Sequence, residues 1–291
     1  MTDYIDEDVA YLVGLLAASG NFSTREDMTT ILIEFPFRTE KMEGRDTYAY
    51  FVAGVAQTIL PRVQKLLGPA ASFHSSRRSH VAIRIQLPAE HLALRDLRMI
   101  LDIHGDERPS RVPEVVLADR SLALEFVRGF ADAAGTIRRS NRDQNGLHRI
   151  YLEVRPHAWE LATGLCQALQ KTLQVPVQGI NWNHPNIRTP GSAWQPSREH
   201  QVRVYAHAFD AVGFYLDLKN QLLAELAEEN RHASPANPVP CNGRARARST
   251  RREHPDEGHE QLPDRLRGRH FNHFTEICAV WQCPLAAAKQ E

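Results

Sequence analysis

Residues 126–137 read FVRGFADAAGTI, and residues 11–22 read YLVGLLAASGNF. Both segments carry glycine at their fourth and tenth positions and an apolar residue two places after the second glycine. An apolar helix that ends at glycine and leads into a strand, present twice, indicates two similar folding units in one chain. A site shared by the two units would then lie where the two helices meet.

Length and composition are those of a globular protein. The chain has 291 residues, of which 42% are hydrophobic, enough for two units with a core. We expect no transmembrane helix, because no run of about 18 uncharged apolar residues occurs. The acidic start of the chain lacks the character of a signal peptide. These features predict a soluble, intracellular protein in the cytoplasm.

The charged residues give a mixed indication about nucleic acids. The formal net charge is +0, which argues against nonspecific binding of nucleic acid through an excess of charge. Of the 35 basic residues, however, 30 are arginine. The planar guanidinium fork suits phosphates and guanine edges, although a GC-rich genome produces the same bias.

Apolar periodicity predicts the same order of elements twice, α-β-β-α-β-β-α in each half. Strands are indicated by alternation, as in residues 29–38, and helices by a period near 3.6. Helices are predicted at 8–19, 48–67, 92–103, 121–134, 157–173 and 209–230. Strands are predicted at 20–27, 29–38, near 70–75, 80–87, 135–142, 148–155, 177–183 and 200–206. The first unit is expected to span 1–118 and the second 119–232.

Two stretches carry a family resemblance. Residues 111–135, RVPEVVLADRSLALEFVRGFADAAG, resemble the entry into the second motif helix of LAGLIDADG homing endonucleases, and residues 211–223 resemble the closing helix of that family. The resemblance covers residues 8–230. It implies an α+β fold in which a pseudo-twofold pair of αββαββα units forms a saddle of two antiparallel sheets over the major groove of DNA.

In that family the two motif helices pack along the pseudo-twofold axis. Small residues at the contact allow the backbones to approach closely. The positions of this chain that match are Gly14, Ala17, Ala18, Gly129, Ala133 and Ala134.

The resemblance also shows where this chain departs from the family. The eighth motif position is normally an acid that binds divalent metal, but here the two positions hold Ser19 and Ala134. Neither side chain carries the charge that a hard cation requires. Asp132 matches the sixth position, whose counterpart in the first motif is Ala17. We therefore expect a catalytically degenerate site.

An alternative keeps some activity. In that case Asp132, or a nearby acid such as Asp27 or Asp143, would support weak nicking with Mg²⁺. Binding of DNA itself would need no cofactor.

The saddle implies which side chains face DNA. Residues that alternate with the buried positions of the strands would read bases, and arginines at strand ends and turns would contact phosphates. The expected DNA-contacting set is Arg77, Arg78, Arg84, Gln86, Arg138, Arg139, Arg142, Arg149, Tyr151, Arg155, Gln201 and Arg203. Arginines on an exposed strand are also ordinary solvated surface, which is the alternative for each one singly.

Residues 233–291 are predicted to be a separate extension. A linker rich in proline at 233–240 precedes a run of five arginines in 244–252, which is either a solvated tail or a contact for phosphates. A set of four ligand types follows, His270, His273, Cys278 and Cys283, which zinc would accept. The alternative is a small helix that packs its aromatic residues, with the Cys and His incidental.

The leading hypothesis is sequence-specific binding of double-stranded DNA by a monomeric, degenerate homing endonuclease-like protein that does not cleave. In a bacterium such a protein would associate with the nucleoid when it is bound to DNA. The alternatives are an active metal-dependent homing endonuclease or nickase with relocated acids, and a transcription regulator or intron maturase on the same scaffold. A structural or interaction protein that has lost DNA binding is a further alternative.

Overall fold

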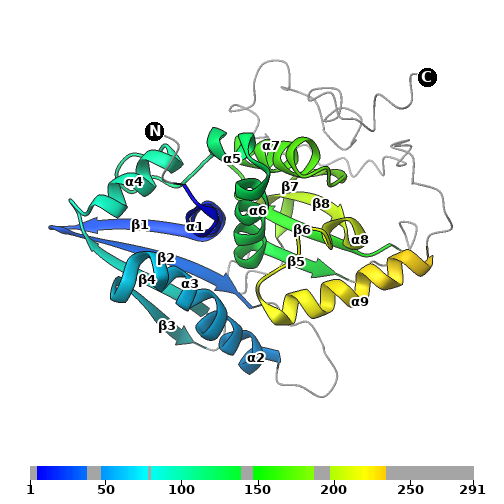
Figure 1. The fold of residues 1–291 in the computed structure, drawn as a ribbon, viewed down its shortest axis with the longest axis horizontal. Coiled ribbons are helices and arrows are strands. Elements are labelled where there is room, and N and C mark those ends of the chain that lie inside the picture. Colours follow the sequence, from blue (N-terminus) through cyan, green and yellow to red (C-terminus); the bar gives the residue numbers. More distant parts are fainter. Residues whose placement is uncertain (1–4, 38–46, 78–79, 139–146, 187–196, 234–291) are drawn as a thin grey trace.

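The computed structural model describes residues 5–37, 47–77, 80–138, 147–186 and 197–233. These residues form two four-stranded antiparallel sheets, one from each half of the chain, with helices packed against them. Helices α1 and α6 lie side by side at the centre of the molecule (Figure 1). The α+β class and the pair of sheets expected from the sequence are confirmed.

The first half begins with α1 (Glu7–Ser19), which starts at a side-chain cap. The Asp6 carboxylate accepts a hydrogen bond from the Val9 amide at 2.8 Å, which satisfies one of the free donors of the first turn. The next elements are β1 (Gly20–Arg25), β2 (Met28–Pro36), α2 (Thr47–Gly54), α3 (Leu60–Leu67), β3 (Ala71–Arg77), β4 (His80–Pro88) and α4 (Leu92–Leu101).

The helix predicted at 48–67 is interrupted by a π-helical turn. Helices α2 and α3 are joined by Val55–Ile59, where the Leu60 amide donates to the Val55 carbonyl. Pro61, which follows, has no N–H and its ring crowds the carbonyl four residues before it. The wider turn lets the helix continue through the proline.

The second half begins with a short helix, α5 (Glu114–Ala118), and then α6 (Arg120–Ala134). The Asp119 carboxylate caps α6 by accepting from the amides of Ser121 and Leu122 at 2.7 and 3.0 Å. The next elements are β5 (Gly135–Arg138), β6 (Arg149–Val154), α7 (Trp159–Gln167), a π-helical turn (Ala168–Thr172), β7 (Val177–Asn186), β8 (Ser197–Tyr205), α8 (Ala206–Phe209) and α9 (Asp217–Ala233).

The single closing helix predicted at 209–230 is wrong. The chain forms the short α8, turns, and then starts α9. Gly213 lies in this turn with φ +71°, a left-handed conformation that glycine adopts without steric cost. The turn leaves backbone amides free to bind a side chain of α6, as described below.

The two sheets have the same strand order, β1-β2-β4-β3 and β5-β6-β8-β7. Their registers match as well, because Gly20 pairs with Ile33 and Gly135 pairs with Leu152. The predicted alternation of β2 is confirmed, since its inward residues Ile31, Ile33 and Phe35 are buried. The pseudo-symmetry therefore extends from the helices to individual strand positions.

Several predictions fall outside the described residues. They concern Arg78, Arg139, Arg142, Asp143, the predicted linker from residue 234 onward, the arginine run at 244–252, and the zinc set His270, His273, Cys278 and Cys283. Cys166 is buried in α7, and burial raises the pKa of its thiol. Among the described residues, no helix is both long and apolar enough to cross a membrane.

Candidate functional site

The two central helices meet at a pair of reciprocal glycine contacts. A Cβ atom added to Gly14 would lie 2.1 Å from the carbonyl oxygen of Phe126, and one added to Gly129 would lie 2.2 Å from that of Tyr11. Tyr11 precedes Gly14 by three residues in α1, and Phe126 precedes Gly129 by three residues in α6. The two contacts are therefore equivalent, and the helix crossing is nearly twofold symmetric. The absence of a side chain at both glycines sets how closely α1 and α6 approach.

The C-terminal ends of the two helices lack carboxylate side chains. Ser19 and Ala134 are the last residues of α1 and α6, and both are half-buried. The Ser19 hydroxyl donates to the Leu15 carbonyl within its own helix at 3.5 Å. These positions therefore offer at most one hydroxyl where the family resemblance implies two acids.

The Asp132 carboxylate accepts hydrogen bonds from groups of the protein itself. Its carboxylate is fully buried and accepts from the Tyr11 hydroxyl at 2.7 Å and from the amides of Tyr215 and Leu216 at 3.2 Å. Burial raises the pKa of Asp132, although the nearby Lys219 ammonium and these hydrogen bonds oppose the rise. The pKa of Tyr11 is also raised, by burial and by the Asp132 carboxylate. Asp132 thus joins α1, α6 and the turn before α9.

Lys219 of α9 binds the end of α6. Its ammonium group donates to the carbonyl oxygens of Ala131, Asp132 and Gly135 at 3.1, 2.6 and 2.8 Å. A cation at this position opposes the negative end of the α6 dipole. No cation was predicted here from the sequence, because the carbonyls that bind Lys219 lie 84 to 88 residues before it.

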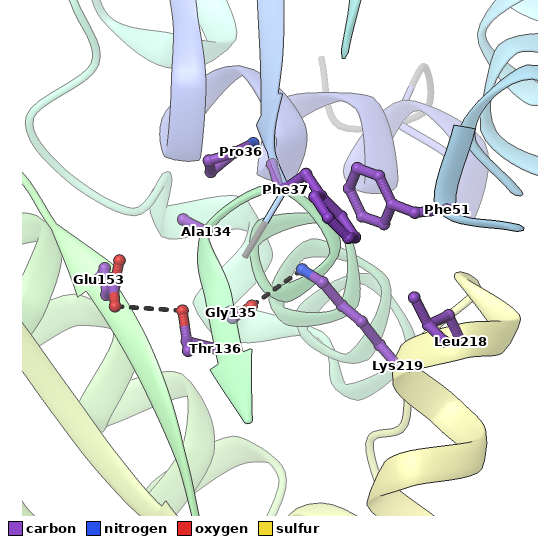
Figure 2. A pocket seen from close by; sticks show the side chains of 10 residues that line it. Pro36, Phe37, Phe51, Ala134, Gly135, Thr136, Glu153, Leu218 and Lys219 are labelled. Atoms are coloured by element: carbon purple, nitrogen blue, oxygen red, sulfur yellow. Dashed lines mark hydrogen bonds between the residues drawn. The ribbon is translucent and has the colours of Figure 1, made fainter. Parts of the chain in front are cut away.

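A shallow pocket surrounds this helix end (Figure 2). Its walls come from the end of β2, from α2, from α6 and β5, from β6 and from α9. It is lined by Pro36, Phe37, Phe51, Ala133, Ala134, Gly135, Thr136, Glu153, Leu218 and Lys219. Figure 2 shows Glu153 beside Thr136, whose hydroxyl donates to the Glu153 carboxylate at 3.1 Å. Glu153 occupies the position of β6 that corresponds in register to Glu34 of β2.

The donor set at this helix end does not fit a divalent metal. Mg²⁺ and Ca²⁺ bind through several carboxylate or carbonyl oxygens. Here Ala134 supplies none, and the carbonyls of Ala131, Asp132 and Gly135 already bind an ammonium ion. In the described part of the chain, no three His, Cys, Asp or Glu side chains gather as a metal site would require.

We expect Lys219→Met to destabilise the protein. The substitution keeps a long apolar stem but leaves three carbonyl oxygens without their cation, at a cost of about 1–3 kcal/mol. Lys171→Met is the matched control, because Lys171 is exposed. Urea denaturation measures both free energies of unfolding. Equal stability of the two variants would contradict a capping role for Lys219.

The predicted acids for residual nicking are separated in the structure. Asp132 is buried among hydrogen-bond donors, and Asp27 is exposed in the turn between β1 and β2. That turn is at the opposite end of β1 from α1. The pocket carboxylate that lies at the helix end is Glu153, which is not among the acids predicted from the sequence.

Arg84 and Gln86 of the first sheet, both predicted to face DNA, lie on its outward side. Arg84 of β4 is half-buried, and its Nη2 lies 3.2 Å from both ring nitrogens of His74 on β3. Gln86, two residues further along β4, is exposed. Arg77 is the last residue of β3.

The corresponding residues of the second sheet are more buried than expected. Arg149 is only 2% exposed, since its Nε donates to Gln178 at 2.6 Å and its guanidinium lies 5.3 Å from the centre of the Tyr205 ring. Gln201 is 1% exposed and donates to Glu199. Tyr151 and Arg203 are half-buried, and Arg138 is the last residue of β5.

Arg155 lies just beyond the sheet. It follows the last residue of β6, and its guanidinium donates to the carbonyl of Pro109 in the segment between the two units. Burial and the neighbouring Arg108 lower the pKa of Arg155 to about 10. Arg155 therefore binds backbone within the protein.

A partly buried charge network, which the sequence did not predict, lies near the N-terminal ends of α1 and α6. The Arg62 guanidinium of α3 lies 4.3 Å from the ring centres of both Tyr11 and Tyr215, and it pairs with Asp8 at 2.7 Å and Glu125 at 2.8 Å. One feature of the sequence could have indicated this network. Glu125 is an acid within an apolar helix, and a buried charge requires a partner.

The comparisons with known proteins concern the fold. No family model and no curated protein matches this chain. The N-terminal LAGLIDADG domain of WhiA is similar with a TM-score of 0.41 at 11% identity, over 71% of this chain and 81% of that one. The LAGLIDADG homing endonuclease I-SmaMI, bound to cleaved DNA, gives 0.40 at 11% identity over 79% and 92%. The meganuclease I-AabMI, bound to uncleaved DNA, gives 0.39 at 12% identity over 78% and 92%. These three solved structures, which this chain resembles distantly in fold, are those of LAGLIDADG proteins.

Proposed function

We propose that this protein binds a specific site on double-stranded DNA without divalent metal and without cleaving the DNA. The observation that carries the proposal is the state of the α6 terminus, where Ala134 replaces an acid and Lys219 binds the carbonyl oxygens. A resident ammonium ion supplies the positive charge there, so the site needs no metal to be stable. The family resemblance of the sequence supports DNA as the partner.

The outward faces of the two sheets support the DNA-binding part. Each central strand pair carries an arginine at the same register position, Arg84 opposite Leu32 and Arg203 opposite Tyr151. Arginine on a strand can reach base edges in a major groove, which is wide enough for a two-stranded ribbon. The pair of sheets therefore presents one arginine to each half of a site.

The proposal predicts binding that resists chelator and depends on salt. We expect selection from random duplexes in EDTA to enrich one sequence, and the affinity for it to fall by about 10-fold or more between 50 and 200 mM salt, because phosphate contacts release counterions. Addition of Mg²⁺ or Mn²⁺ to a supercoiled plasmid that carries the enriched site should leave the plasmid uncut. Failure to enrich any sequence would overturn the proposal.

The second candidate function is nicking of one DNA strand. The observation that favours it is the position of Glu153. This carboxylate lies in the pocket at the end of α6, next to Thr136. A single acid at one helix end would support cutting of one strand at most. Conversion of the plasmid to the open circular form by the wild type, and not by Glu153→Gln, would establish nicking and exclude the non-cleaving function.

A further inference from the structure

Two arginines and two tyrosines alternate on the central strands of the second sheet. Tyr151 of β6 pairs with Arg203 of β8, and Arg149 of β6 pairs with Tyr205 of β8. Cation and ring are therefore neighbours both along and across the strands, and the Arg149 guanidinium lies 5.3 Å from the centre of the Tyr205 ring. We call these four residues the Arg–Tyr cluster.

The first sheet has no such cluster at the same positions. Because Gly20 pairs with Ile33 and Gly135 with Leu152, each position of the Arg–Tyr cluster has a counterpart in the other sheet. The counterparts of Arg149, Tyr151, Arg203 and Tyr205 are Thr30, Leu32, Arg84 and Gln86. One arginine and no aromatic residue stand on the first sheet where the second sheet has two of each.

The two equivalent arginines also differ in their partners. Arg84 contacts both ring nitrogens of His74 at 3.2 Å. The Nε of Arg203 is buried and has no hydrogen-bond partner among the described residues. Across from Arg203 on β7 stands Gly179, where an added Cβ would lie 3.7 Å from Arg203 Nη2, so no side chain intervenes.

The surroundings of Arg203 favour an incoming acceptor. Burial lowers its pKa, and the neighbouring Arg149 also acts to lower it. The Nε is buried and therefore out of reach of a ligand, so an incoming acceptor would meet the Nη groups, of which Nη2 lies beside Gly179. Guanine offers two such acceptors, O6 and N7, in the geometry of the guanidinium fork.

We infer that recognition of DNA is one-sided, with Arg203 as the specificity-determining residue that contacts a guanine in the half-site under the second sheet. The inference rests on the proposed function and adds to it a dominant half-site and a base. A base edge is favoured over a phosphate because β8 is an inner strand of its sheet, away from the edges where a groove-bound sheet meets the DNA backbone.

The test uses the full chain and the duplex enriched by selection. We expect Arg203→Ala to weaken binding to that duplex by about 10- to 100-fold and to abolish the preference for one guanine, the loss typical of a bidentate base contact. Arg84→Ala, at the equivalent position of the first sheet, is the comparison variant and should weaken binding by a smaller factor than Arg203→Ala while leaving the guanine preference in place. Arg203→Lys keeps the charge and the stem but lacks the fork, and should lose the same guanine preference.

The outcomes separate this inference from the proposed function. If the wild type enriches a sequence but Arg84→Ala and Arg203→Ala lose affinity equally, recognition is two-sided and the inference is wrong while the proposed function stands. If Arg203→Ala weakens binding to every duplex by the same factor, the residue contacts phosphate and does not determine specificity. If the wild type enriches nothing, the proposed function itself fails.

Discussion

Replacing Gly14 or Gly129 with alanine is expected to destabilise the protein by about 3 kcal/mol or more, at the upper end of the cost of overpacking a core. The new methyl carbon would lie 2.1 or 2.2 Å from a backbone carbonyl oxygen of the facing helix. Neither partner atom belongs to a flexible side chain, so α1 and α6 would have to move apart. Urea denaturation of the two variants measures the effect.

Gly54→Ala is the matched control for this pair. Gly54 also lies in a helix, but an added Cβ would approach only the Leu216 side chain, at 3.3 Å. Because alanine is the better helix former, the control should lie within about 1 kcal/mol of the wild type. Loss of stability in the control equal to that in Gly14→Ala would show that the close helix crossing is not the cause.

The second large effect is expected for Asp132→Ala. Removal of this carboxylate leaves the Tyr11 hydroxyl and the amides of Tyr215 and Leu216 without their acceptor inside the core. It also removes a carboxylate that interacts electrostatically with the half-buried Lys219 ammonium. We expect a loss of about 3–5 kcal/mol, because each of three donors left without an acceptor costs about 1–3 kcal/mol.

Tyr11→Phe and Asp27→Ala complete that experiment. Tyr11→Phe removes one of the three donors and should lose about 1–2 kcal/mol, whereas Asp27 is exposed in a turn and its substitution should change stability by less than about 0.5 kcal/mol. If Asp132→Ala unfolds no more readily than Asp27→Ala, the carboxylate does not join the two units.

The effect of pH on Asp132 has a definite sign. Burial raises its pKa in the folded protein above the unfolded value, so the folded state holds its proton more tightly. The resulting stabilisation is present below the unfolded pKa of about 3.9 and is lost as the pH rises through the folded pKa. A wild type that loses stability across that interval more steeply than Asp132→Asn agrees with this assignment.

Much of the fold was predictable from local pattern. The duplicated helix with its two glycines predicted two units, and alternation predicted β2 and β6 closely, because one face of each strand packs on the core. The prediction of one continuous helix at 209–230 was wrong for a reason that is also physical. Residues 209–216 have helical composition, but Gly213 and the acceptor on Asp132 make a turn more stable there.

The candidate site was predictable only in part. The absence of acids at Ser19 and Ala134 can be read directly from the motif. Lys219 could not be assigned a role, because a single lysine in an amphipathic helix has the same sequence signature whether it faces water or another helix. The burial of Arg149 and Gln201 was likewise missed, since alternation marks the outward face of a strand but does not reveal what lies beside it.

The amino-acid sequence by itself determined that there are two equivalent halves and that their motif helices end without carboxylates, because both facts depend on residue identity and on spacing along the chain. Only the tertiary structure decided what replaces those carboxylates. Asp132 and Lys219 acquire their partners from segments 83 to 121 residues away, and apart from the Tyr11 hydroxyl these partners are backbone amides and carbonyls, which are not specific to a residue type. Backbone groups leave no trace in a sequence pattern, so a site built from them becomes visible only when the folded chain brings them together.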